Sequence, residues 1–227
     1  LAAGVDAGDG AGGQQGDRAA MTTALFNAVR GNDLKEVGRL LDAGIDVDQV
    51  RAGGITPLLD AASGGHYEVV KLLLDRGANV DQVLKYGDTP LLVAAFRGHD
   101  AVVGLLLDRG AFVNSAKTSG ATPLYIAAQN GHTAVVGQLL GAGADVIQAR
   151  TGGITPLIIA AQNGYEDVVS LLLDQDGIDV TQAANKTEWL WNSKTGGFYN
   201  VPHTPLNVAA KAGNKAVVKL LVPKVLE

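Results

Sequence analysis

The segment "TPLLDAA" at residues 56–62 decides the fold, because close variants of it return at a fixed spacing. The variants are "TPLLVAA" at 89–95, "TPLYIAA" at 122–128 and "TPLIIAA" at 155–161, each 33 residues after the one before, and "TPLNVAA" follows at 204–210. A constant interval of this length predicts a repeat protein, in which each structural unit is stacked on the next.

Each unit has the sequence pattern of two helices followed by a loop. Thr is a favourable N-cap, and Pro at the next position has a helical φ and lacks an N–H that would stay unpaired. In the unit that begins at Thr56, the glycines 64 and 65 can end the first helix, and Gly77 can end the second. The expected apolar faces of these two helices are formed by Leu58, Ala61, Ala62, Val69, Val70, Leu72, Leu73 and Leu74.

The 33-residue period, with "TPL", "AA", "GH", "VV", "LLL" and "GA" in register, resembles the ankyrin repeat over residues 22–227. The resemblance implies an all-α solenoid of paired antiparallel helices with short β-hairpin fingers between units. Residues 1–20 are predicted to be a flexible Gly/Ala-rich tail, and residues 21–227 a single ankyrin-repeat domain. The six predicted units are approximately 22–54, 55–87, 88–120, 121–153, 154–202 and a C-terminal cap at 203–227.

Two departures from the family pattern stand out. The family usually has His after "TPL", where this chain has Leu59, Leu92, Tyr125, Ile158 and Asn207. The last unit ends in "VVKLLVPKVLE", and Pro223 is predicted to break its helix.

The fifth unit is longer than the others. Thr155 and Thr204 are 49 residues apart, which is sixteen more than the period, and the surplus contains "TEWLWNSKTGGFYN" at 187–200. Strand-like "EWLW" and "FYNV" flank a turn-like "NSKTGG", so we expect an extended β-hairpin with its insertion at 187–202. Trp189 and Trp191 then share one face, opposite Phe198 and Tyr199. These aromatic residues either contact a partner or seal the last repeat.

The residues offer little for catalysis or metal binding. The chain has no cysteine, which excludes disulfides, Cys-ligated zinc and a thiol nucleophile. His66, His99 and His132 occupy one position in consecutive units, about 8–10 Å apart, which is too far for a shared zinc ion. The resemblance gives them a structural hydrogen-bonding role at the start of each second helix.

Asp60 stands where the other units have Val93, Ile126, Ile159 and Val208. A buried carboxylate needs a partner, and we expect a local hydrogen bond with Asn27. The alternative, a catalytic acid, lacks an accompanying Ser, Lys or His at any fixed offset. No catalytic residue, metal site or cofactor is therefore expected.

We expect a non-enzymatic protein–protein interaction module that is a monomer and binds no small-molecule substrate and no nucleic acid. A net charge of −5 argues against general nucleic-acid binding, and no apolar run is long enough to cross a membrane. The alternative is a regulatory or targeting segment of a larger enzyme or of a pathogen-type effector. An intracellular location is favoured but not fixed.

The resemblance implies contacts through the finger tips and the concave face of the first helices. The candidate residues are Lys85, Tyr86, Phe96, Arg97, Gln129, Asn130, Arg150, Gln162 and Asn163, with Trp189, Trp191, Phe198 and Tyr199 on the extended finger. Lys and Arg gather at these positions, whereas Asp and Glu gather on the second helices, so this surface is predicted to be a basic groove that favours an acidic partner. The alternative is that these charges only solvate the loops.

Overall fold

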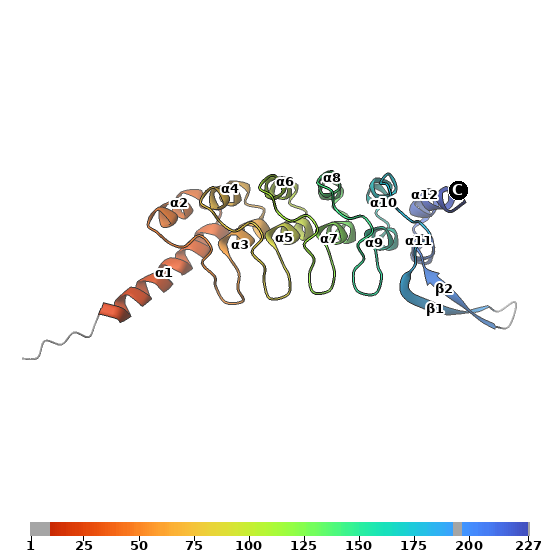
Figure 1. Ribbon diagram of the computed structural model, residues 1–227, viewed down its shortest axis with the longest axis horizontal. Helices are drawn as coiled ribbons and strands as arrows, with labels where there is room; N and C mark the ends of the chain where they lie inside the picture. The colour runs from red at the N-terminus through yellow and green to blue at the C-terminus, as the bar shows by residue number, and fades with distance from the viewer. Residues whose placement is uncertain (1–9, 193–196, 227) are drawn as a thin grey trace, which may run out of the picture.

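The computed structural model describes the backbone of residues 10–192 and 197–226, and the side chains of residues 18–185 and 201–226. Within this part of the chain, twelve helices form two layers, and loops project from one side of them (Figure 1). The layer next to the loops contains α1 (Gly10–Arg30), α3 (Pro57–Gly64), α5 (Pro90–Arg97), α7 (Pro123–Asn130), α9 (Pro156–Asn163) and α11 (Pro205–Ala212). The other layer contains α2 (Leu34–Asp42), α4 (Tyr67–Asp75), α6 (Asp100–Asp108), α8 (Thr133–Gly141), α10 (Glu166–Leu173) and α12 (Lys215–Leu226).

The predicted Thr-Pro caps are confirmed. The Thr56 hydroxyl accepts a hydrogen bond from the Leu59 amide at 3.3 Å, and the same bond begins α5, α7, α9 and α11. Gly65 ends α3 with a φ of 70°, a left-handed conformation that favours glycine. The two ends of α3 are therefore set by residues next to it in the sequence.

The core runs continuously along the stack. Ala61 and Ala62 of α3 are fully buried, as are Val69, Val70 and Leu73 of α4, and the corresponding residues of the next three helix pairs lie in the same cluster. Because alanine side chains are small, the helices of adjacent repeats can approach closely. Each unit can bury its apolar face only against its neighbours, so the stack depends on these contacts.

Histidines link successive repeats, which confirms a hydrogen-bonding role for two of them. His99 Nε2 lies 3.1 Å from the carbonyl oxygen of Ser63, and His132 Nε2 lies 3.0 Å from that of Phe96. Each imidazole thus reaches the end of the first helix in the preceding repeat. In the last repeat Asn214 takes this place and donates to the Ala161 carbonyl at 3.0 Å.

At the N-terminal end, the helix α1 begins at Gly10, within the residues 1–20 for which the sequence predicts a flexible tail. At the C-terminal end, the prediction that Pro223 breaks the last helix is wrong, because the helix α12 continues through Pro223 to Leu226. A proline removes one intrahelical hydrogen bond, and the buried Val217 and Leu221 hold the preceding turns in place.

The predicted extended hairpin is confirmed. β1 (Ala184–Asn192) pairs with β2 (Gly197–His203) in antiparallel register, with Trp191 opposite Phe198 and a bulge between Ala184 and Thr187. The hairpin leaves the stack on the side of the loops, at the C-terminal end of their row (Figure 1). Residues 193–196 and the side chains of Trp189, Trp191, Phe198 and Tyr199 lie outside the described residues, so both interpretations of the aromatic residues stay predictions.

Among the helices that the structure describes, none combines the length and the hydrophobicity that a membrane crossing requires.

Candidate functional site

The candidate site is the surface that we call the finger face. It consists of the four loops at residues 51–55, 84–88, 117–121 and 150–154, together with the last turns of α3, α5, α7 and α9. The loops hang side by side below the first helices (Figure 1). Each loop is closed by two backbone hydrogen bonds; in the first, the Arg51 amide donates to the Ile55 carbonyl at 3.0 Å and the Gly54 amide donates to the Arg51 carbonyl at 2.9 Å.

Neighbouring fingers are joined to one another through their backbones. The Thr118 amide donates to the Tyr86 carbonyl at 3.1 Å, and the Thr151 amide donates to the Ser119 carbonyl at 2.9 Å. The Asn185 amide, near the start of β1, donates to the Gly152 carbonyl at 2.9 Å. From the second finger onward, the finger row and the base of the long hairpin therefore form one connected edge.

Two of the candidate aromatic residues are exposed beside a cation. Tyr86 is 64% exposed at a finger tip, and the Lys85 Nζ lies 5.6 Å from its ring centroid. Phe96 is 47% exposed at the end of α5, and the Arg97 Cζ lies 5.5 Å from its ring centroid. Both pairs present an apolar ring and a positive charge to solvent together.

The four candidate amides lie at the ends of α7 and α9. The Asn130 side chain donates to the Ile126 carbonyl at 2.8 Å, and the Asn163 side chain donates to the Gln129 carbonyl at 2.9 Å. Gln162 and Asn163 are exposed, whereas Gln129 and Asn130 are half-buried. The two asparagines thus satisfy backbone carbonyls at or near helix ends.

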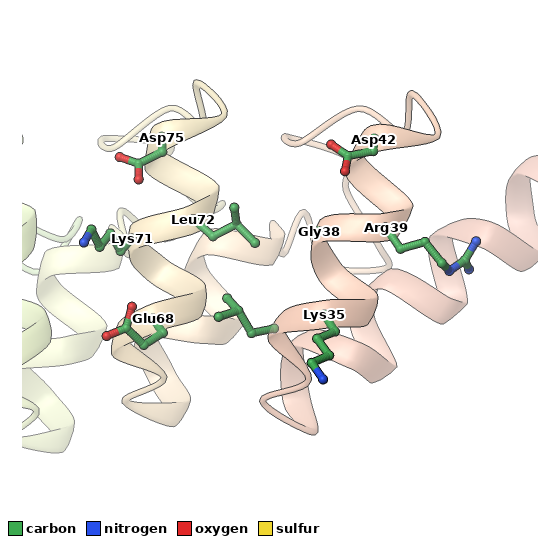
Figure 2. A pocket seen from close by; sticks show the side chains of 9 residues that line it. Lys35, Gly38, Arg39, Asp42, Glu68, Lys71, Leu72 and Asp75 are labelled. Carbon is green, nitrogen blue, oxygen red and sulfur yellow. The ribbon is translucent and has the colours of Figure 1, made fainter.

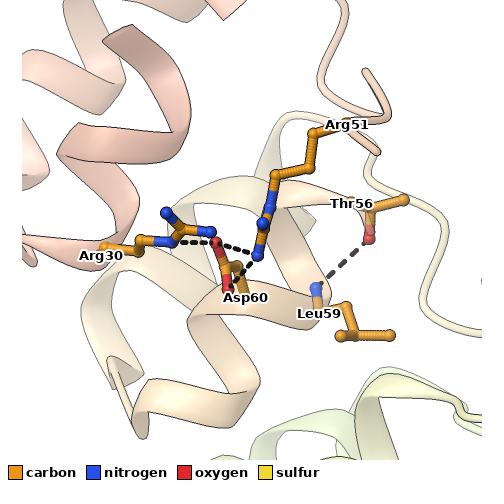
Figure 3. A network of polar contacts seen from close by, with 5 residues as sticks. All are labelled: Arg30, Arg51, Thr56, Leu59 and Asp60. Carbon is orange, nitrogen blue, oxygen red and sulfur yellow. Dashed lines mark hydrogen bonds and ion pairs between the residues drawn. The ribbon is translucent and has the colours of Figure 1, made fainter. Parts of the chain in front are cut away.

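Asp60 contacts Arg30 and Arg51 rather than Asn27, so the predicted partner is wrong. Arg30 Nε donates to Asp60 Oδ2 at 2.9 Å, and Arg51 Nη2 donates to Oδ1 at 3.2 Å. Figure 3 shows the carboxylate between the two guanidinium groups. A charged hydrogen-bond donor binds a carboxylate more strongly than a neutral amide does, and the Asp60 side chain is only 15% exposed.

The candidate Arg150 is half-buried, because it lies against Tyr125 of α7. Its Cζ is 5.9 Å from the Tyr125 ring centroid, and its Nη1 donates to the Tyr125 hydroxyl at 3.3 Å. The Tyr125 side chain, in the position after "TPL", is 1% exposed. Sequence reasoning missed this contact, although the pattern "RAGGIT" at 51–56 and "RTGGIT" at 150–155 could have indicated that the two fingers are built alike.

Charge on the finger face is partly neutralised. Besides Arg30 and Arg51, which share Asp60, Lys117 Nζ lies 2.6 Å from Asp88 Oδ1. Lys85 and Arg97 lie against aromatic rings instead. Three cations of the finger face, Lys85, Arg97 and Arg150, thus lie against aromatic rings rather than carboxylates.

A separate groove of about 590 Å³ lies between α2 and α4, in the layer away from the fingers. Figure 2 shows Lys35, Arg39 and Asp42 on α2 and Glu68, Lys71 and Asp75 on α4, with Arg39 directed away from α4 and Lys71 away from α2. Leu34, Gly38 and Leu72 also line the groove. The rim carries both signs of charge, so it favours neither an anion nor a cation.

Within the described ranges, no three His, Asp or Glu side chains are close enough together to hold a metal ion. The finger face consists of loop backbone, aromatic rings, amides, cations and the two carboxylates of Asp60 and Asp88, and this mixture suits a binding surface.

A search of curated proteins found no match. A family model described as "Ankyrin repeats (3 copies)" matches residues 25–117, 78–150 and 113–184. These matches overlap and together cover most of the chain, and the layered helix pairs with projecting fingers agree with them. The chain belongs to the ankyrin repeat family.

Proposed function

We propose that the protein is a non-enzymatic interaction module that binds the acidic surface of a partner protein through its finger face and the β1–β2 hairpin. Ankyrin repeats are generally protein–protein interaction modules, and the partner chemistry is what the proposal adds.

The observation that carries the proposal is the pair of exposed aromatic residues with cations beside them. Tyr86 with Lys85 and Phe96 with Arg97 offer ring surface for burial and a charge for a carboxylate of the partner. Aromatic residues and Arg are the residue types on which interface affinity concentrates. Uncompensated positive charge also speeds encounter with an acidic surface and disfavours a basic one.

The backbone bonds between fingers support the same proposal. Because Thr118, Thr151 and Asn185 connect the second, third and fourth fingers and the base of the hairpin, these loops are ordered before a partner arrives. Binding then costs less conformational entropy than it would for separate flexible loops. The hairpin extends this edge and adds the candidates Trp189, Trp191, Phe198 and Tyr199 to it.

The experiment is affinity capture from a lysate of the source cells, followed by measurement of the affinity of the captured protein. The test variants are Tyr86→Ala with Phe96→Ala, and Arg97→Glu. The matched controls are Phe112→Ala, which removes a ring that is 70% exposed in the turn after α6, and Lys71→Glu on α4. Both test variants should weaken binding at least about tenfold, which corresponds to 1.4 kcal/mol, and both controls should bind as wild type does. Equal binding by all four variants would contradict the proposal.

A further inference from the structure

The first and fourth fingers, at 51–55 and 150–154, are built alike, but only the Arg of the first finger contacts a carboxylate among the described residues, that of Asp60. Arg51 and Arg150 are three repeat lengths apart and begin "RAGGIT" and "RTGGIT". Each forms an isolated β-bridge with the Ile four residues later, and each lies over the ring 25 residues before it, Phe26 or Tyr125. The two guanidinium groups are therefore held in matching environments.

The first finger shows how a carboxylate binds in this environment. Asp60 lies between Arg51 Nη2 and Arg30 Nε, at 3.2 Å and 2.9 Å (Figure 3). Its side chain remains 15% exposed, so the position between the two cations is reached by solvent.

The fourth finger has the same arrangement of Arg on an aromatic ring, but no carboxylate at the position of Asp60. Three repeats after Asp60 the chain has Ile159, and three repeats after Arg30 it has Gln129, whose amide can also donate to a carboxylate. Arg150 donates to the Tyr125 hydroxyl, and its buried Nε, like that of Arg51, has no hydrogen-bond partner among the described residues. A guanidinium that is half-buried and has N–H groups without partners binds a carboxylate more favourably than a fully hydrated guanidinium does.

We infer that Arg150, oriented by Tyr125, is a binding site for a single carboxylate side chain of the partner, with the Gln129 amide, which takes the repeat position of Arg30, as a second donor. An Asp or Glu of the partner then lies over Ile159, where Asp60 lies in the first finger. The inference rests on the proposed function for the source of the carboxylate, and it deepens that function by naming one contact and its chemistry.

The test uses the whole protein, with acetate as the probe and acetamide as its neutral isostere. The guanidinium N–H resonances of Arg150 are followed by NMR while each compound is added, and they are assigned by their loss in Arg150→Lys. We expect a saturable shift of Arg150 with acetate and none with acetamide. The Arg51 resonances serve as the internal control, and they should not shift because Asp60 already occupies that position.

Ile159→Asp supplies the missing carboxylate within the chain, so it should abolish the acetate shift of Arg150. An acetate response of Arg150 that equals that of Arg51, or that acetamide reproduces, overturns the inference. This result is distinguishable from failure of the proposed function, because the titration needs no partner and the capture experiment with Arg97→Glu needs no change at Arg150.

Discussion

The Arg150 guanidinium lies over the buried ring of Tyr125 and donates to its hydroxyl at 3.3 Å. The same stacking joins Arg51 to Phe26, with 5.3 Å between Cζ and the ring centroid. In both cases the Arg side chain of a finger packs on an aromatic ring in the first helix of the same repeat, α1 or α7. A cation on an aromatic face at a partly desolvated site contributes about 0.5–2 kcal/mol, enough to fix a short loop.

Removing the Tyr125 hydroxyl should remove its hydrogen bond with Arg150 and keep the stacking of Arg150 on the ring. Tyr125→Phe is expected to lower the free energy of unfolding by about 0.5–1.5 kcal/mol, because Arg150 Nη1 loses its acceptor in a half-buried place. Urea unfolding measures it. Tyr86→Phe, at an exposed finger tip, is the control and should leave stability unchanged. Equal stability of Tyr125→Phe and wild type would show that the hydrogen bond contributes nothing.

Neutralising Asp60 should loosen the N-terminal repeats in particular. Asp60→Asn leaves Arg30 and Arg51 without their shared carboxylate, and we expect a loss of about 1–3 kcal/mol in the free energy of unfolding. Amide hydrogen exchange should speed up in α1 and α3 more than in α9. Asp88→Asn removes a carboxylate that is 22% exposed and pairs with Lys117 alone, so it should cost less. A larger effect of Asp88→Asn would contradict this ranking.

Much of the fold could be predicted from local rules. The Thr56 cap, the Gly65 helix end and the hairpin between Ala184 and His203 depend on residues close in sequence, and these predictions were confirmed. Pro223 shows the limit of such rules, because tertiary packing of Val217 and Leu221 keeps a helix that local preference would end.

The contacts that shape the candidate site were harder to predict. Arg51 reaches Phe26 and Asp60 only after the finger has folded back on the helices, so no short-range pattern indicates these pairs. The ion pairs of the finger face are equally hard to predict, since Asp60 contacts Arg51 and Asp88 contacts Lys117 only in the folded protein. Counting charges cannot show which of them meet.

The link between repeats through His132 should be replaceable by an amide. His132→Ala removes the bond to the Phe96 carbonyl and should cost about 0.5–1.5 kcal/mol in the free energy of unfolding. His132→Asn should recover part of this loss, because Asn214 at the last repeat donates to the Gln162 carbonyl, the equivalent of the Phe96 carbonyl, at 2.9 Å. Thermal and urea unfolding give both values. If His132→Asn is as unstable as His132→Ala, the hydrogen bond is not the source of the effect.

Acid should affect the turn that precedes the long hairpin. The hydroxyl and the amide of Thr181 donate to the Asp179 carboxylate at 2.6 Å and 2.8 Å and lower its pKa. Because the pKa of Asp179 is lower in the folded protein, its contact with Thr181 stabilises the fold at pH values above the ordinary Asp pKa of about 4. This contribution is lost as the pH falls through the lowered pKa of Asp179.

An NMR titration of the Asp179 carboxyl carbon in Thr181→Val should show a higher pKa than in wild type. Thr181→Ser, which keeps the hydroxyl, should retain the low pKa. An unchanged pKa in Thr181→Val would mean that the hydroxyl does not lower it.

The central claim is that the partner binds the finger face, and hydrogen exchange of the complex tests it most directly. With the captured partner bound, we predict slower exchange in the fingers at 84–88, 117–121 and 150–154 and in the strands at 184–192 and 197–203. The helices α2 and α4, which line the groove on the other layer, should exchange as they do in the free protein. Protection confined to α2 and α4, with the fingers unchanged, would contradict the account.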